Sequence, residues 1–130
     1  MVTDRVGDFI IRLQNAAMVG KREVEVPRSL HLLAIAKKLR ELGFIEKIED
    51  EADGRSFAVT LAYDEKSSAP RLSGVKRLSK PGRRLYAPST GAHQVKGGMG
   101  ARILSSSKGI VTDAEARRDR VGGEALFEIW

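Results

Sequence analysis

The sequence predicts an α+β protein of two small lobes: an N-terminal α-β-α-β-β lobe, and a mainly β C-terminal lobe with one short helix. In the first half, helical spacing of apolar residues gives way to two-residue alternation. In the second half, short apolar runs are broken by proline and glycine, which is typical of strands and turns. Composition and charge both change near residue 66, so we expect lobes at 1–65 and 66–130.

Two helices and three strands account for the N-terminal lobe. Thr3-Asp4 can cap a helix, and the apolar residues that follow at helical spacing predict that helix over 4–17. A second helix is expected to begin after Ser29 and to end at Gly43. The strands are expected at 23–26, 44–48 and 57–63. The last two strands should form a hairpin, because Asp53-Gly54 between them is a turn signal.

Short strands and a single helix account for the C-terminal lobe. Residues 66–70 are the linker candidate, since they combine serines with a proline where the charge changes sign. Thr112 and Glu115 have the spacing of a capping box and predict a helix over 113–119. The strands are expected at 72–78, 84–87, 101–105 and 125–130.

The composition excludes several classes of site. Cysteine is absent, which excludes a disulfide framework, a zinc–thiolate site and a cysteine nucleophile. His31 and His93 lie in no metal-ligand spacing, and no carboxylate pair stands out from ordinary surface acids. We therefore expect no metal site, no catalytic residues and no small-molecule substrate. No apolar run approaches the ~18 residues of a membrane span, so we expect a cytoplasmic protein.

The positive charge is concentrated in one half of the chain. Residues 66–130 carry 13 Lys and Arg against 5 Asp and Glu, whereas residues 1–65 carry 10 against 12. Residues 66–108 contain ten bases and no acid. A folded stretch of one sign faces an anionic partner, most often nucleic acid, and its turns argue against the basic amphipathic helix that a membrane surface would favour. The simpler alternative is a basic surface that only keeps the protein soluble.

Two motifs in this basic stretch are candidate RNA contacts. The first is a turn at Pro81-Gly82, where Pro81 fixes one turn position and Gly82 allows a positive φ. The bases around that turn are Lys76, Arg77, Lys80, Arg83 and Arg84. The second motif gathers small hydroxyls that can reach 2′-hydroxyls and base edges. Its residues are Ser105, Ser106, Ser107, Lys108 and Gly109. The alternatives are an ordinary charged hairpin and an ordinary serine-rich loop.

The sequence allows more than one role for each of four residues, which are Ser105, Lys108, Glu124 and Tyr86. Ser105 and Lys108 match the S-x-x-K spacing of serine acylases, but the companion motifs are absent and the chain is short. Glu124 is either a surface acid, an acceptor for the amino group of a base, or a residue that holds neighbouring arginines. Tyr86 either packs against the protein or stacks on a base.

In their order and spacing, these motifs resemble the bacterial small-subunit ribosomal protein family numbered eight. The most specific stretches are 74–82, 105–109, 112–118 and 122–124. The resemblance implies a structural RNA-binding protein without cofactor or enzymatic activity. It also implies a primary binder of the central domain of 16S ribosomal RNA that aids subunit assembly. The implied partners are small-subunit ribosomal RNA, neighbouring small-subunit proteins and, in some members, their own messenger RNA, whose translation they repress.

The resemblance also assigns residues to the RNA surface. It gives the main recognition role to 105–109, with Glu124 beside this segment and the basic turn and Tyr86 along the same RNA face. The N-terminal helix of the family approaches a second RNA helix. The residues implied there are Thr3, Asp4, Arg12 and Asn15.

The chain departs from the family's pattern at five positions. Arg5 stands where proline is usual and Gln14 where arginine is usual, which moves the positive charge along the first helix. Ser106 replaces threonine and keeps the hydroxyl. Arg83 and Arg102 replace residues that are usually apolar. Because Arg102 points away from its apolar neighbour in the expected strand, it should reach solvent or RNA.

Overall fold

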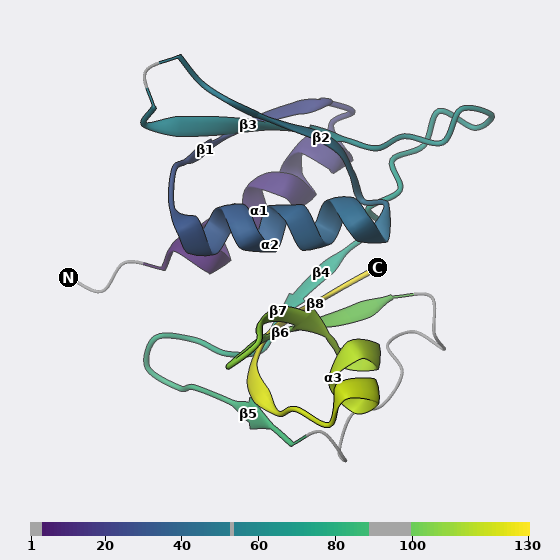
Figure 1. The fold of residues 1–130 in the computed structure, drawn as a ribbon. Helices are drawn as coiled ribbons and strands as arrows, with labels where there is room; N and C mark the ends of the chain where they lie inside the picture. Colours follow the sequence, from purple (N-terminus) through teal and green to yellow (C-terminus); the bar gives the residue numbers. More distant parts are fainter. Residues whose placement is uncertain (1–3, 53, 89–99) are drawn as a thin grey trace. The chain divides into compact units, whose positions relative to one another are not determined.

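The computed structural model describes residues 4–52, 54–88 and 100–130, which Figure 1 shows as coloured ribbon. Its contacts divide the chain into two compact units, one of Asp8–Ser73 and one of Met1–Gly7 with Gly74–Trp130. Each unit contains an antiparallel sheet and helical residues, so the predicted α+β class is confirmed. The lobe boundary at 65/66 stays a prediction, because contacts do not show which segment folds on its own.

In the unit Asp8–Ser73, two helices cover one face of a three-stranded sheet (Figure 1). The strand order is β1-β3-β2 and both pairings are antiparallel, so the predicted hairpin of β2 and β3 is confirmed. The elements are α1 (Arg5–Met18), β1 (Glu23–Pro27), α2 (Leu30–Leu42), β2 (Ile45–Asp50) and β3 (Ser56–Leu61). Phe9, Leu13, Ile35, Phe57 and Val59 are almost completely buried and form the centre of this unit. Burying these faces is what stabilises the helices against the sheet.

Both ends of α2 lie where the sequence predicts them. The side chain of Ser29 accepts a hydrogen bond from the backbone N–H of Leu32, as an N-cap residue does. Gly43 has a φ of +92°, which L side chains rarely adopt, and its N–H donates to the carbonyl of Arg40. The turn residues therefore set the length of this helix.

The second unit is built on a five-stranded sheet, with β8 paired to three other strands. The order is β4-β8-β6-β7, and β5 also pairs with β8. The elements are β4 (Val75–Arg77), β5 (Tyr86–Ala87), β6 (Ala101–Ser106), β7 (Gly109–Thr112), α3 (Asp113–Asp119) and β8 (Gly123–Ile129). The predicted capping box of α3 is confirmed, since Thr112 and Glu115 exchange hydrogen bonds. Leu104, Val111 and Ala125 pack with Ala116 of α3 in a buried cluster.

The structure corrects three expectations in this unit. The strands predicted at 72–78 and 84–87 are shorter in the structure, where they are β4 and β5. Only part of each predicted segment pairs with β8. Strand β7 was not predicted, since Ile110 and Val111 follow the serine run without alternation. Gly82 does not use the positive φ that the Pro-Gly pair allowed.

Gly123 has no room for a side chain, and this yields a prediction about stability. A Cβ at Gly123 would lie 2.5 Å from the carbonyl oxygen of Ser105, so β8 and β6 would have to move apart. Gly123→Ala should destabilise the protein by about 1–3 kcal/mol in urea unfolding. The control is Gly82→Ala, where no atom lies within 4 Å of the added Cβ. Equal unfolding midpoints for the two variants would contradict the prediction.

Candidate nucleic-acid interface

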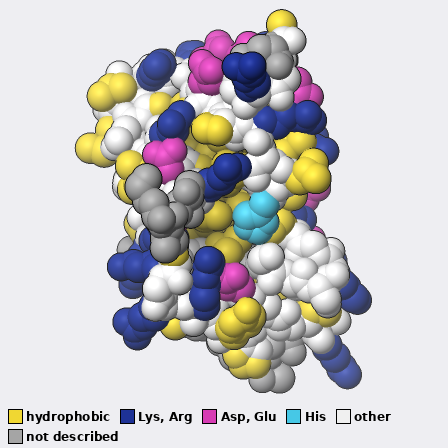
Figure 2. All heavy atoms as spheres, turned by 90° about the vertical axis from the view of Figure 1, so that its left-hand side faces the viewer, with side chains coloured by type: hydrophobic (Ala, Val, Ile, Leu, Met, Phe, Trp, Pro, Cys, Tyr) yellow, Lys and Arg dark blue, Asp and Glu magenta, His cyan; other side chains and the backbone are white. Residues whose placement is uncertain are grey.

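The whole net charge of the chain belongs to the unit that contains β4 to β8. Residues 1–7 and 74–130 carry 12 Lys and Arg against 6 Asp and Glu, a net of +6. Residues 8–73 carry 11 against 11 and are neutral. In Figure 2 the lower part of the surface shows Lys and Arg side chains spread around an acidic one. Such a surface attracts polyanions at long range and gives salt-dependent binding.

Strand pairing brings three of the predicted site residues into one row. Glu124 of β8 lies directly opposite Tyr86 of β5 on one side and Ser105 of β6 on the other. Directly opposed residues of antiparallel strands point to the same face of the sheet. Tyr86, Glu124 and Ser105 therefore form a row of an aromatic ring, a carboxylate and a hydroxyl. Tyr86 is 76% exposed, so this end of the row is open to a ligand.

The serine-rich segment is the tight end of the hairpin between β6 and β7. Ser106 pairs with Gly109, and Ser107 and Lys108 form the exposed tip. The hydroxyl of Ser106 donates to the carbonyl of Gly109 at 2.9 Å and accepts from the N–H of Lys108 at 3.1 Å. Gly109 has a φ of +100°, which favours glycine. The hydroxyl of Ser106 thus shapes the turn, while Ser107 and Lys108 lie on its outer side.

The basic turn is closed by two backbone hydrogen bonds. Lys80 and Arg83 each donate an N–H to the other's carbonyl, both at 2.9 Å, around Pro81-Gly82. The side chains of Lys80, Arg83 and Arg84 are exposed, and so is that of Lys76 in β4. The predicted turn is therefore present. Its charges are available to an anionic partner, as phosphate contacts require.

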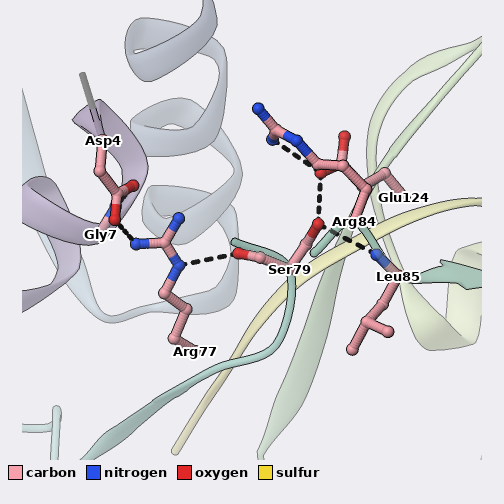
Figure 3. A network of polar contacts seen from close by, with 7 residues as sticks. All are labelled: Asp4, Gly7, Arg77, Ser79, Arg84, Leu85 and Glu124. Atoms are coloured by element: carbon pink, nitrogen blue, oxygen red, sulfur yellow. Dashed lines mark hydrogen bonds and ion pairs between the residues drawn. The ribbon is translucent and has the colours of Figure 1, made fainter. Parts of the chain in front are cut away.

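Glu124 is held by two side chains that come from the basic segment (Figure 3). The hydroxyl of Ser79 donates to Oε2 of Glu124 at 2.5 Å, and Nη1 of Arg84 lies 3.0 Å from the same oxygen. The Glu124 side chain is only 18% exposed, whereas that of Arg84 is 54% exposed. The carboxylate is therefore held within the unit, between Tyr86 and Ser105 in the row. In this structure one neighbouring arginine, Arg84, pairs with Glu124, and the role of Glu124 toward RNA stays a prediction.

Arg77 lies deeper than the other predicted basic contacts. Its Nε donates to the carbonyl of Ser79 at 2.8 Å, and its Nη1 forms an ion pair with Asp4 of the same unit. The other carboxylate oxygen of Asp4 accepts from the N–H of Gly7 at 3.0 Å (Figure 3). Burial lowers the pKa of the Arg77 guanidinium, Arg84 lowers it further and Glu124 opposes both. The group stays charged at neutral pH, and it anchors the start of α1.

Arg12 and Asn15, which were also predicted to contact RNA, lie on α1. Arg12 pairs with Asp8 at 3.0 Å and donates to the carbonyl of Glu25 at 2.9 Å. Arg12 and Asn15 line a cavity of about 440 Å³ between α1 and β1. Thr3 lies outside the described residues. Among the residues that the structure describes, no His, Asp and Glu cluster could hold a metal, and no helix is long and apolar enough to span a membrane.

Comparison with known proteins identifies the family. The family model described as Ribosomal protein S8 matches residues 4–130. The chain belongs to the ribosomal protein S8 family. It is 44% identical to small ribosomal subunit protein uS8c of Chlorokybus atmophyticus over 100% of both chains. It is also 42% identical to small ribosomal subunit protein uS8 of Synechocystis sp. over 98% of both chains. The resemblance inferred from the motifs is therefore confirmed.

One unusual residue of this S8-family chain, Arg102, has a structural partner. Arg102 lies opposite Glu128 across β6 and β8, and its Nη2 is 2.9 Å from Oε2 of that residue. Both side chains are only 14% exposed. The expectation that Arg102 reaches solvent or RNA is therefore wrong, because a cross-strand acid compensates its charge within the sheet. Glu128 was missed since no pattern in the sequence shows which strand pairs with β6.

The ion pair of Arg102 and Glu128, which is mostly buried, yields a second prediction. Arg102→Ala should destabilise the chain by about 1–3 kcal/mol, because it leaves the carboxylate of Glu128 desolvated without this partner. Urea unfolding measures the change. The control is Lys47→Ala, which removes the exposed ion pair with Glu49 and should leave the midpoint unchanged. If Arg102→Ala unfolded at the same urea concentration as the parent, the structural role of the pair would be refuted.

Proposed function

We propose that this protein is a structural constituent of the small ribosomal subunit that binds the central domain of 16S ribosomal RNA and aids subunit assembly. It acts in the cytoplasm, beside neighbouring small-subunit proteins and without enzymatic activity. The observation that carries the proposal is the row of Tyr86, Glu124 and Ser105 beside an exposed Ser107-Lys108 tip. That row lies in the unit with the whole net positive charge. Full-length similarity to proteins named uS8 supports the same function.

Two kinds of group contribute to RNA binding in different ways. Exposed bases supply affinity through phosphates, with arginine forming a bidentate fork and lysine a point charge. These bases are Lys76, Lys80, Arg83, Arg84 and Lys108. The row and the hairpin tip supply selectivity, because hydroxyls and a carboxylate recognise 2′-hydroxyls and base edges of an irregular RNA helix. Tyr86 offers a face on which an unstacked base can lie.

The remaining predicted contacts have supporting roles in this proposal. The hydroxyl of Ser106, the φ of Gly109 and the ring of Pro81 shape the two turns that reach the RNA. Arg77 orients the basic turn through the carbonyl of Ser79. By the same resemblance, the N-terminal helix and the residues just before it contact a second RNA helix through Thr3, Asp4, Arg12 and Asn15. By resemblance, the same surface binds the protein's own messenger RNA and represses its translation.

Competition binding tests the proposal. The protein is bound to a central-domain fragment of small-subunit ribosomal RNA in the presence of excess transfer RNA at several salt concentrations. We expect the fragment to be retained against the competitor, because transfer RNA offers phosphates but not the recognised shape. If binding collapses with competitor and salt alike, the surface is only electrostatic, and the proposed selective function is refuted.

The hairpin tip yields a prediction about selectivity. Ser107→Ala should weaken binding to the central-domain fragment by about 1 kcal/mol or more, since it removes a hydroxyl that is buried in the complex. Filter binding or fluorescence anisotropy measures the change. The matched control is Ser73→Ala, which removes an exposed hydroxyl from the neutral unit. An unchanged affinity of the Ser107→Ala variant would remove the tip from the interface.

The basic turn yields a prediction of a different kind. Lys80→Ala should weaken binding to the fragment and to transfer RNA alike, and should lower the slope of log affinity against log salt by about one. The control is Lys37→Ala, which removes an exposed lysine of α2 in the neutral unit. A loss confined to the ribosomal fragment, with the slope unchanged, would show that Lys80 does not act as a phosphate contact.

A further inference from the structure

Ser79 is a buried polar residue that no sequence pattern singles out. It is 3% exposed and lies between two residues predicted to bind RNA, Arg77 and Lys80. Its hydroxyl donates to Oε2 of Glu124 at 2.5 Å and accepts from the backbone N–H of Leu85 at 3.2 Å. A serine hydroxyl has one donor and two acceptor sites, so its donor is directed at Glu124 and an acceptor at Leu85. The hydroxyl thus links the end of the basic turn to β8 (Figure 3).

The backbone around Ser79 is held from both sides. Its N–H and that of Leu78 both donate to the carbonyl of Leu126, at 3.3 Å and 3.0 Å. Its carbonyl accepts from Nε of Arg77 at 2.8 Å. A buried side chain on such an anchored backbone has little rotational freedom. Ser79 is therefore a fixed donor, close to β8 and aimed at a single carboxylate oxygen.

Arg84 reaches the same oxygen but is a different kind of partner. Its side chain is 54% exposed, and exposed ion pairs hold their geometry weakly in water. A phosphate near the basic turn also competes with Glu124 for the Arg84 guanidinium, because arginine pairs with both anions. The buried hydroxyl of Ser79 has no access to phosphate. A phosphate that drew Arg84 away would therefore leave the hydrogen bond from Ser79 to Glu124 in place.

We propose that Ser79 is the positioning residue of the RNA surface: its hydroxyl holds the Glu124 carboxylate in the row with Ser105 and Tyr86 while Arg84 is shared with phosphate. The proposal rests on the proposed function, since it concerns how that same surface selects its RNA. Ser79 itself contacts no RNA. It acts through Glu124, and its loss should reduce selectivity without reducing the number of phosphate contacts.

A double-mutant cycle tests this role. Ser79→Ala, Glu124→Ala and the double variant are compared by competition of the central-domain fragment against transfer RNA. Ser79→Ala should lower the preference for the fragment about fivefold or more, with the salt slope unchanged. In the Glu124→Ala background the same substitution should have no further effect on the preference, because the proposed role of Ser79 in selectivity passes through that carboxylate.

A matched control separates positioning from loss of stability. Ser56 is also buried, at 7% exposure, and its hydroxyl donates to Oε1 of Glu25 at 3.1 Å in the neutral unit. Ser56→Ala therefore loses the same kind of hydrogen bond, and it should leave the RNA preference unchanged. Ser79→Cys keeps a similar, slightly larger side chain with a much weaker donor. It should also lower the preference, and it decides the matter if Ser79→Ala does not fold.

The outcomes distinguish this proposal from the function on which it rests. If the parent protein shows no preference for the fragment, the proposed function fails and the role of Ser79 fails with it. If the parent is selective and the folded Ser79→Ala or Ser79→Cys variant is equally selective, only the positioning role is overturned. A loss of preference that is as large in the Glu124→Ala background would also overturn it, because the effect would then not pass through Glu124.

Discussion

The pairing of β8 with β4, β5 and β6 is the constraint on which the candidate interface depends. One strand brings the basic turn and Tyr86 together with the serine-rich hairpin, which is distant from them in the sequence. The close approach at Gly123 makes this possible, since a side chain there would meet the backbone of Ser105. The register that follows places Glu124 between Tyr86 and Ser105. In a different register, Glu124 would not lie opposite Tyr86 and Ser105.

The residues of this surface fall into two groups: bases that are exposed, and residues that contacts within the protein hold in place. The exposed bases attract any polyanion, and that attraction alone carries no information about RNA shape. Information comes from groups whose positions are fixed, and the side-chain contacts of Glu124 with Ser79 and of Arg77 with Asp4 provide such positions. Arg102 is a base used in the opposite way, because its partner Glu128 holds it within the sheet. A count of bases alone does not separate these roles.

Much of the fold could be predicted because its signals are local. The capping residues Ser29 and Thr112, the left-handed Gly43 and the hairpin of β2 and β3 all depend on residues close in the sequence. The short strands β4 and β5 were overestimated and β7 was missed, because their lengths depend on pairing with distant strands. The candidate site was predicted as a set of residues. Its arrangement as a row, and the contribution of Ser79, could not be, since one serine among bases has no recognisable pattern.

By itself, the sequence determined the α+β class, the helix ends, the basic half of the chain and the motifs of the S8 family, because composition, spacing and capping are properties of neighbouring residues. The tertiary structure alone decided which of the bases are exposed and which are paired inside the protein. Arg77 and Arg102 differ from Lys80 and Arg83 in forming ion pairs with acids that lie far away in the chain, Asp4 and Glu128. The physical reason is that antiparallel pairing, which aligns Glu124 and Glu128 with their neighbours, is a long-range property of the sheet.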